Sequence, residues 1–230
     1  MKILLIIPAY NESENIKKLI ESLTVDYPNY HYVVVNDCST DRTREILLDC
    51  QANYLDLPDN LGIGGGVQTG YLYALENGYD IAVQIDGDGQ HDPKYIKDII
   101  TPIEKGQADV VIGSRFLEKE GFQSSSIRRF GIHFLHRLIK ILCGIDVRDV
   151  TSGMRAVNRK MIEEYAHNYA QDYPEPEAIL AAGMMNARVM EVPVVMRERQ
   201  GGTSSINLLR SVYYMIKVSI ALVMTQLTAR

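Results

Sequence analysis

Short apolar runs alternate with segments of helical periodicity along the first half of the chain, and this alternation restricts the fold more than any other feature. Apolar runs predict strands at residues 2–8, 31–36, 54–57, 81–85 and 109–112. After the first four runs, helical spacing and helix-starting residues predict helices that end near residue 23, span 41–50 and 67–77, and begin at 92–93. This order is typical of parallel sheets with right-handed crossovers. We therefore expect an α/β fold with a mostly parallel central sheet flanked by helices, in a single domain over residues 1–205.

The glycine run at residues 62–66 lies in a segment, 58–66, that we expect to form a loop. The run superficially resembles a dinucleotide-binding fingerprint, but it follows the third predicted strand and lacks the GxGxxG context. A turn that lets the next helix pack close to the sheet is the simpler interpretation.

Polar residues directly follow three of the predicted strands, at residues 8–12, 37–41 and 86–90. Because ligands collect at the carboxyl ends of parallel strands, we expect these segments to share one crevice. The last of them continues into Asp92, so that Asp86, Asp88 and Asp92 crowd three negative charges into seven residues. A cation would relieve their repulsion, and such oxygen ligands, with Gln90 alongside, suit Mg²⁺ or Mn²⁺. An ordinary acidic turn is the alternative.

The character of the sequence changes beyond residue 112. Residues 113–126 are polar, as loops are, and residues 127–143 predict a helix with two faces. One face carries Arg129, His133, Arg137 and Lys140, and the other carries Phe130, Phe134, Leu138 and Ile141. The basic stripe is either a solvated face or a surface that contacts anions.

The last segment, residues 206–230, predicts an amphipathic helix after a flexible linker at 200–205. Arg210 and Lys217 interrupt its apolar residues, so it lacks the uncharged run of a membrane span. A stripe of Arg210, Tyr214, Lys217 and Ala221 is expected opposite Val212, Met215, Ile216, Ile220 and Val223. Such a helix either caps the core or lies among lipid headgroups, and its basic residues favour the membrane surface.

Charge and cysteine content exclude several other classes. A net charge of −5 argues against a general nucleic-acid binder. The three cysteines lack paired spacing, which supports neither a disulfide framework nor a zinc site and favours a reducing compartment. The apolar run at residues 2–8 has no cleavage site and continues into a helix start, so we expect a strand there and not a signal peptide.

Six motifs follow one another along the chain: IIPAYNE at residues 6–12, VVVNDCSTD at 33–41, DGDGQHDP at 86–93, GSR at 113–115, DVTSGMRA at 149–156 and RERQGGTSS at 197–205. Together they resemble the family-2 glycosyltransferases with the GT-A fold, and within them the polyprenyl-phosphate sugar synthases related to dolichyl-phosphate mannosyltransferase. The resemblance covers the whole chain, and chance agreement of six ordered motifs is improbable. YPEPE at residues 173–177 resembles bacterial relatives associated with cell-surface polysaccharide assembly.

The resemblance implies roles for individual residues. It implies that the nucleotide is bound by Pro8, Tyr10, Glu12, Asp37 and Asp86. It also implies that Mg²⁺ or Mn²⁺ is bound by Asp86, Asp88 and Gln90. The catalytic residues that the resemblance implies are Asp88, Arg115 and Arg197, and the residues that it implies bind the acceptor phosphate are Arg129, His133 and Ser204. The sequence departs from the family's pattern at Asn36, where aspartate is common, at Cys38, where glycine is common, and at His133, where a small hydroxyl residue is expected.

The resemblance also implies an activity, the inverting and metal-dependent transfer of a hexose from a nucleotide sugar to a polyprenyl phosphate. A UDP-hexose is favoured over GDP-mannose as donor, and undecaprenyl phosphate is the favoured acceptor, at the cytoplasmic face of the cell membrane. Two alternatives stay open. A related enzyme transfers sugar to a saccharide hydroxyl and needs a carboxylate base, for which Asp149 and Glu175 are candidates. An inactive nucleotide-binding scaffold protein is the alternative from another class.

Overall fold

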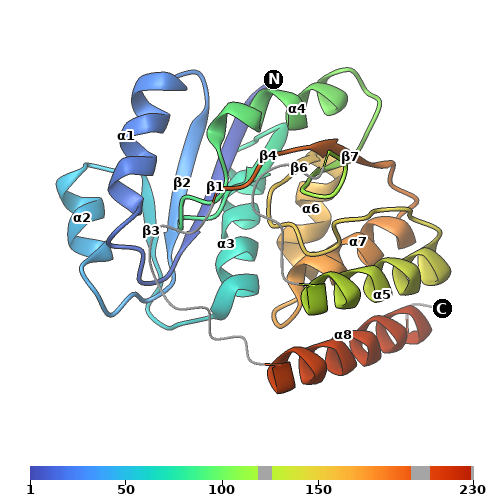
Figure 1. Cartoon of the computed structure of the whole chain (residues 1–230). Coiled ribbons are helices and arrows are strands. Elements are labelled where there is room, and N and C mark those ends of the chain that lie inside the picture. Colours follow the sequence, from blue (N-terminus) through green and yellow to red (C-terminus); the bar gives the residue numbers. More distant parts are fainter. Residues whose placement is uncertain (119–125, 198–207, 229–230) are drawn as a thin grey trace.

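A seven-stranded sheet forms the centre of the protein in the computed structural model, which describes residues 1–118, 126–197 and 208–228 (Figure 1). The strands lie in the order β3-β2-β1-β4-β6-β5-β7. Their bounds are Ile3–Ala9 (β1), His31–Asn36 (β2), Tyr54–Asp56 (β3), Ile81–Gln84 (β4), Val110–Ser114 (β5), Arg155–Asn158 (β6) and Val189–Pro193 (β7). β6 runs antiparallel to β4 and β5, and the other neighbouring strands pair in parallel. The predicted α/β fold with a mostly parallel sheet is confirmed.

Helices cover both faces of this sheet. Their bounds are Ile16–Asp26 (α1), Thr43–Asp49 (α2), Gly62–Glu76 (α3), Ile96–Glu104 (α4), Ser126–Cys143 (α5), Arg159–Asn168 (α6), Pro174–Met184 (α7) and Leu208–Thr228 (α8), with a short 3₁₀ turn at Pro93–Tyr95. Alternate residues of β1 serve the two faces: Leu5 and Ile7 pack with α1, α2 and α4, whereas Leu4 and Ile6 pack with the helices of the other face. The apolar run therefore became a central strand because both of its faces are buried.

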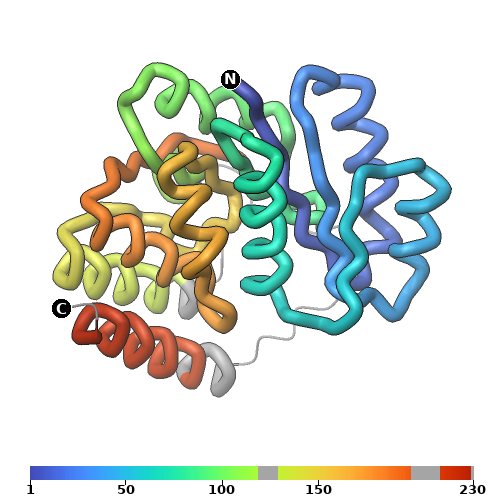
Figure 2. The backbone as a smooth tube through the Cα atoms, turned by 180° about the vertical axis from the view of Figure 1, so that it is seen from behind, coloured from blue at the N-terminus to red at the C-terminus, as the bar shows by residue number. Residues whose placement is uncertain are grey.

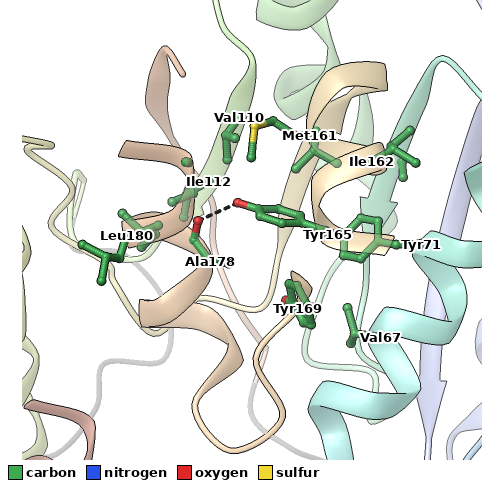
Figure 3. Close-up of a cluster of buried hydrophobic side chains, with 14 of the residues drawn as sticks. Val67, Tyr71, Val110, Ile112, Met161, Ile162, Tyr165, Tyr169, Ala178 and Leu180 are labelled. Carbon is green, nitrogen blue, oxygen red and sulfur yellow. Dashed lines mark hydrogen bonds between the residues drawn. The ribbon is translucent and has the colours of Figure 1, made fainter. Parts of the chain in front are cut away.

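Three buried tyrosines join α3 to α6 and the turn that follows α6 (Figure 3). The ring centroids of Tyr71, Tyr165 and Tyr169 lie 5.3 to 5.4 Å apart, which is the usual range for aromatic pairs. The Tyr165 hydroxyl donates a hydrogen bond to the carbonyl of Ala178 in α7 at 2.7 Å. This cluster ties α3, whose first turn borders the candidate site, to α6 and α7.

The helix after β3 begins earlier than the sequence predicts. α3 starts at Gly62, so the expected loop at residues 58–66 is wrong over its second half. A Cβ atom at Gly64 would lie 2.3 Å from the carbonyl oxygen of Ala170 and 2.5 Å from Gln171. The glycines thus allow the first turn of α3 to touch the backbone of the turn after α6, a contact between distant segments that local patterns do not reveal.

The two amphipathic helices also differ from expectation in the faces that they bury. α5 packs Ile132, Leu135 and Ile139 into the core, while Phe130 is 77% exposed and Ile141 is 81% exposed. The expected apolar stripe of α5 is therefore largely on the surface.

α8 lies along α5 at the edge of the molecule in both views (Figures 1 and 2). It buries Val218 and Leu222, and Tyr214, which belongs to the expected polar stripe, packs partly against the core, whereas Lys217 of the same stripe is exposed. Large apolar side chains point outward instead, including Ile216 and Ile220. Within the described ranges, we find no helix that is long and apolar enough to cross a membrane.

Candidate functional site

A cavity of about 310 Å³ opens where β1, β2 and β4 end. Its lining comprises Pro8, Ala9, Tyr10, Glu12, Asp37, Asn60, Gly62, Ile63, Gly66, Asp86, Gly87 and Asp88. Every residue that the resemblance implies for the nucleotide is in this lining, together with Asp88. The prediction that the three strand-end clusters share one crevice is confirmed for these residues.

Hydrogen bonds between loops hold the first wall of the cavity. The side-chain oxygen of Asn11 accepts hydrogen bonds from the backbone N–H groups of Thr40 at 2.8 Å and Asp41 at 3.2 Å. The N–H of Glu12 donates to the Thr43 hydroxyl at 2.8 Å. The loops after β1 and β2 are therefore fixed to each other before any ligand arrives.

Asp37 is held at the wall by the start of α3. Its Oδ1 accepts a hydrogen bond from the N–H of Leu61 at 2.7 Å, and its carbonyl accepts one from the Asn60 amide at 3.0 Å. The residue is 4% exposed. A carboxylate fixed in this way at the cavity wall can accept a hydrogen bond from an N–H group of a base.

The departure from the family's pattern at Asn36 has a structural cause. The Asn36 amide donates to Asp56 Oδ1 at 2.6 Å, and its Oδ1 accepts from the N–H of Ser39 at 3.4 Å. An aspartate at this position would set two carboxylates against each other. Asn36 is 1% exposed and is not in the cavity lining, so it braces the wall from behind.

Cys38, the second departure, has a positive φ of 55°. This left-handed conformation favours glycine, which the family often has at this position. The cysteine therefore carries backbone strain at the turn beside Asp37.

Asp86 and Asp88 provide the acidic part of the cavity. Asp88 Oδ1 accepts a hydrogen bond from the N–H of Gln90 at 3.0 Å, and the N–H of Gly87 donates to the carbonyl of Pro8 at 3.3 Å. These bonds fold the acidic loop onto the end of β1. Both aspartates reach the cavity, and their hard oxygen atoms fit Mg²⁺ or Mn²⁺.

The described residues do not complete a metal cage by themselves. Among them, no group of three or more His, Cys, Asp and Glu side chains is arranged to hold a metal ion. Two carboxylates suit the open kind of site in which substrate phosphates and water supply the remaining ligands. Gln90, the third implied ligand, lies beside the two aspartates in the loop, and its amide donates to the carbonyl of Arg197 at 3.3 Å.

Arg197 is brought to the acidic loop from the far end of the chain. Its N–H donates to the Gln90 carbonyl at 3.0 Å, and its guanidinium pairs with Asp92 Oδ2 at 2.7 Å. The side chain of Arg197 remains 55% exposed. Ser204, the other residue implied from this segment, lies outside the described residues.

Arg115 is engaged in a buried ion pair and is not in the cavity lining. Its Nε donates to Asp149 Oδ2 at 2.7 Å and its Nη2 donates to Asp149 Oδ1 at 2.6 Å, with side-chain exposures of 7% and 0%. Its backbone N–H also donates to Asp149. Asp149, in the loop after α5, thus holds this guanidinium, and the expectation that Arg115 contacts a substrate phosphate stays a prediction.

Arg129 and His133 lie on the exposed face of α5 and are not in the cavity lining. The ring of His133 lies 5.7 Å from that of His136, the next turn of the same helix. The structure therefore does not bring these two residues together with the aspartates in the cavity.

Three residues that the motifs did not indicate, Asn60, Ile63 and Gly66, also line the cavity, from the first turn of α3 and the residues before it. They fall in the segment expected to be a loop. The glycine run was the available signal, because small residues at a helix start permit the close approach of backbone or ligand.

The chain matches the family described as Glycosyl transferase family 2 over residues 4–166. It is 28% identical over 221 residues to the undecaprenyl-phosphate mannosyltransferase of Micrococcus luteus, covering 90% of this chain and 88% of that one. It is 30% identical over 215 residues to the UDP-N-acetylglucosamine–dolichyl-phosphate N-acetylglucosaminyltransferase of Methanococcus voltae, covering 84% of each. Among solved structures, the fold is similar to that of glucosyl-3-phosphoglycerate synthase from Mycobacterium tuberculosis, with a TM-score of 0.73, 18% identity and coverage of 98% and 79%. That protein was also crystallised with Mn²⁺ and UDP.

Proposed function

The chain belongs to glycosyl transferase family 2 and is a glycosyltransferase, and we propose that it moves a hexose from a nucleotide sugar to a polyprenyl phosphate. One observation supports this most strongly: Pro8, Tyr10, Glu12 and Asp37 line the same cavity as the two aspartates of the acidic loop. Residues proposed to bind a nucleoside thus lie next to residues proposed to bind a metal ion. A nucleoside diphosphate needs both, because its phosphates bind the metal. Relatives named for polyprenyl-phosphate and dolichyl-phosphate acceptors support the second half of the proposal.

A UDP-hexose is the favoured donor, with GDP-mannose as the alternative. Asp37 would accept a hydrogen bond from the N–H of the base, which both uracil and guanine offer. The Methanococcus voltae relative is named for a UDP-sugar, and a protein of the same fold was crystallised with UDP and Mn²⁺. These relatives support the choice of uridine.

The proposed chemistry needs stabilisation of a leaving diphosphate more than it needs a base. Asp86 and Asp88 would hold Mg²⁺ or Mn²⁺, which when bound neutralises charge on the departing nucleoside diphosphate. Arg197, whose backbone N–H is hydrogen-bonded to Gln90 of the acidic loop, carries a guanidinium suited to phosphate oxygens. A lipid monophosphate with a second pKa of about 6 is mostly dianionic at neutral pH, so it can attack without losing a proton to the protein. Attack opposite the leaving group inverts the anomeric centre.

Transfer to a saccharide hydroxyl is the second candidate, and it would require a carboxylate base. Asp149 is a poor base, because it is fully buried and accepts hydrogen bonds from both the backbone and the guanidinium of Arg115. Glu175, at the start of α7, is the remaining candidate. A lipid phosphate that supplies its own nucleophile is therefore the simpler acceptor.

A surface suited to lipid lies on α5 and α8, and we name it the α5–α8 face. It comprises the exposed side chains Phe130, Phe134, Ile141, Tyr213, Ile216, Ile220, Val223, Met224 and Leu227. Basic side chains lie on the same two helices: Arg129, His133, Arg137, Lys140 and Lys217. Exposed apolar side chains together with basic side chains on the same helices are typical of helices at anionic membrane surfaces. We infer that this face holds the protein at the inner face of the cell membrane, where a lipid phosphate is within reach.

The donor and acceptor are tested by incubating the protein with undecaprenyl phosphate, Mg²⁺ or Mn²⁺, and a panel of UDP- and GDP-sugars, and by identifying the lipid product. Asp88→Ala should lose activity by orders of magnitude and remain folded. Asp98→Ala, which removes an exposed carboxylate from α4, is the matched control and should keep full activity. Full activity of Asp88→Ala, or sugar transfer to a saccharide and not to the lipid, contradicts the proposal.

Membrane attachment is tested by flotation with vesicles that contain anionic lipid. Ile220→Asp, in the α5–α8 face, should reduce flotation. Ile220 is 58% exposed, so the negative charge of the new aspartate would replace an apolar side chain among the lipid headgroups. Val25→Asp on α1 is the control, since Val25 is 76% exposed on a helix of the opposite sheet face. Deletion of residues 206–230 should also reduce binding, and equal flotation of all variants contradicts the attachment.

A further inference from the structure

Asp86 is the strand-end carboxylate of the acidic loop, and two buried side chains hold it from behind. We propose that His91, with Gln84, is a positioning residue that fixes the orientation of the Asp86 carboxylate for the donor. This inference rests on the proposed function, because it assigns the orientation to a metal and a nucleoside diphosphate.

Both ring nitrogens of His91 lie near Asp86. Its Nδ1 accepts a hydrogen bond from the backbone N–H of Asp86 at 2.9 Å, and its Nε2 lies 3.7 Å from Asp86 Oδ2. Because Nδ1 accepts, the ring proton is on Nε2, the nitrogen that lies 3.7 Å from the carboxylate. The distance of 3.7 Å exceeds that of a hydrogen bond, but the N–H dipole of a histidine that is only 3% exposed favours one orientation of the nearby carboxylate.

Gln84 acts on the other oxygen of the same carboxylate. Its Nε2 donates to Asp86 Oδ1 at 3.4 Å, and its Oε1 accepts from the Tyr169 hydroxyl at 3.5 Å. Gln84 is 1% exposed, and Tyr169 belongs to the buried tyrosine cluster (Figure 3). The amide is therefore itself fixed, with its nitrogen directed at Asp86.

The backbone closes a third side of the carboxylate. A Cβ atom at Gly153 would lie 3.0 Å from Asp86 Oδ2 and 3.1 Å from Oδ1. A side chain at position 153 would therefore fit only if the carboxylate shifted by a few tenths of an ångström. Asp86 has little freedom to rotate, while its side chain keeps 33% exposure and reaches the cavity.

A carboxylate that is oriented before the ligand binds does not need to be ordered during binding. Substitution of residues that are hydrogen-bonded to metal ligands typically changes metal affinity by about 10–100-fold. A purely structural role for His91 is the competing explanation, because the Nδ1 bond alone closes the loop from Asp86 to His91. The two nitrogens allow the explanations to be separated.

The test compares two substitutions. His91→Asn keeps an acceptor near the position of Nδ1 and removes Nε2, whereas His91→Gln keeps an amide near the position of Nε2 and removes the loop-closing acceptor. For each variant we would measure the thermal unfolding midpoint, the calorimetric affinity for UDP or GDP with Mn²⁺, and the kcat and donor KM. His31→Asn is the control, because His31 is a histidine of β2 whose Nδ1 contacts Tyr79 and not the cavity.

We expect His91→Asn to unfold near the wild-type temperature and to bind Mn²⁺ with the nucleotide about 10-fold more weakly. The loss should appear mainly as a higher donor KM. His91→Gln should lower the unfolding temperature more than it lowers the affinity. Wild-type affinity and KM in His91→Asn overturn the inference but leave the proposed function intact. Failure of the wild-type protein to bind either nucleotide with Mn²⁺ overturns the proposed function and the inference together.

Discussion

The buried pair of Arg115 and Asp149 allows a quantitative prediction about what this arginine does. Asp149 is fully buried and accepts three hydrogen bonds from Arg115, from the backbone N–H at 3.0 Å, from Nε at 2.7 Å and from Nη2 at 2.6 Å. Asp149→Asn keeps the size of the side chain and removes its charge. The guanidinium would then be left in the interior without its counter-charge, which costs about 3–5 kcal/mol in comparable buried pairs. That is a large share of the roughly 5–15 kcal/mol that stabilises a folded domain.

The measurement is urea unfolding followed by far-UV circular dichroism, since the chain has no tryptophan to serve as a fluorescent probe. Asp146→Asn is the matched control. Asp146 also contacts basic side chains, Lys140 and His136, but its side chain is 58% exposed and water can replace them, so little change in stability is expected. A loss of less than about 1 kcal/mol in Asp149→Asn would refute the reasoning.

A double substitution then separates a structural role of Arg115 from a role in phosphate binding. Replacing both partners by apolar residues, as in Arg115→Met with Asp149→Leu, removes the unpaired charge and should recover much of the lost stability. If Arg115 is structural, the double variant should be active wherever it is folded. A folded and inactive double variant would show instead that the guanidinium acts on the substrate.

Three further predictions concern the cavity wall and its surroundings. Cys38→Gly should raise the free energy of unfolding by up to about 1 kcal/mol in urea titration, because the left-handed φ of 55° is unstrained in glycine; a clear loss of stability would contradict this. Gly153→Ala should weaken Mn²⁺-dependent nucleotide binding about 10-fold in calorimetry, because its Cβ would press on the Asp86 carboxylate; unchanged affinity would contradict the close fit. Burial first, and the nearby charge of Asp172 second, raise the pKa of Glu177. The folded protein therefore binds this proton more tightly than the unfolded chain, so stability falls as pH rises through the raised pKa, and Glu177→Gln should flatten that fall in unfolding measured from pH 4 to 8.

Features that depend on neighbours along the chain follow from the amino-acid sequence alone. Apolar runs with buried residues on both sides predicted the first five strands, and the acidic residues just beyond β4 predicted one wall of the cavity. Strand topology then predicted that Asp37 and Asp86 share a crevice, because parallel strands end at the same edge of a sheet.

Features that depend on contacts between residues far apart in the sequence are apparent only in the tertiary structure. Asp149 lies 34 residues beyond Arg115 and holds its guanidinium in a buried ion pair, which the sequence pattern did not predict. The early start of α3 depends on the backbone at Ala170, more than one hundred positions after Gly64. On α5 and α8, periodicity predicted amphipathic helices but not which side faces the core, because both sides of each helix carry large apolar residues. Local patterns report the period of a segment, whereas the choice of face and partner follows from which surfaces meet when the whole chain packs.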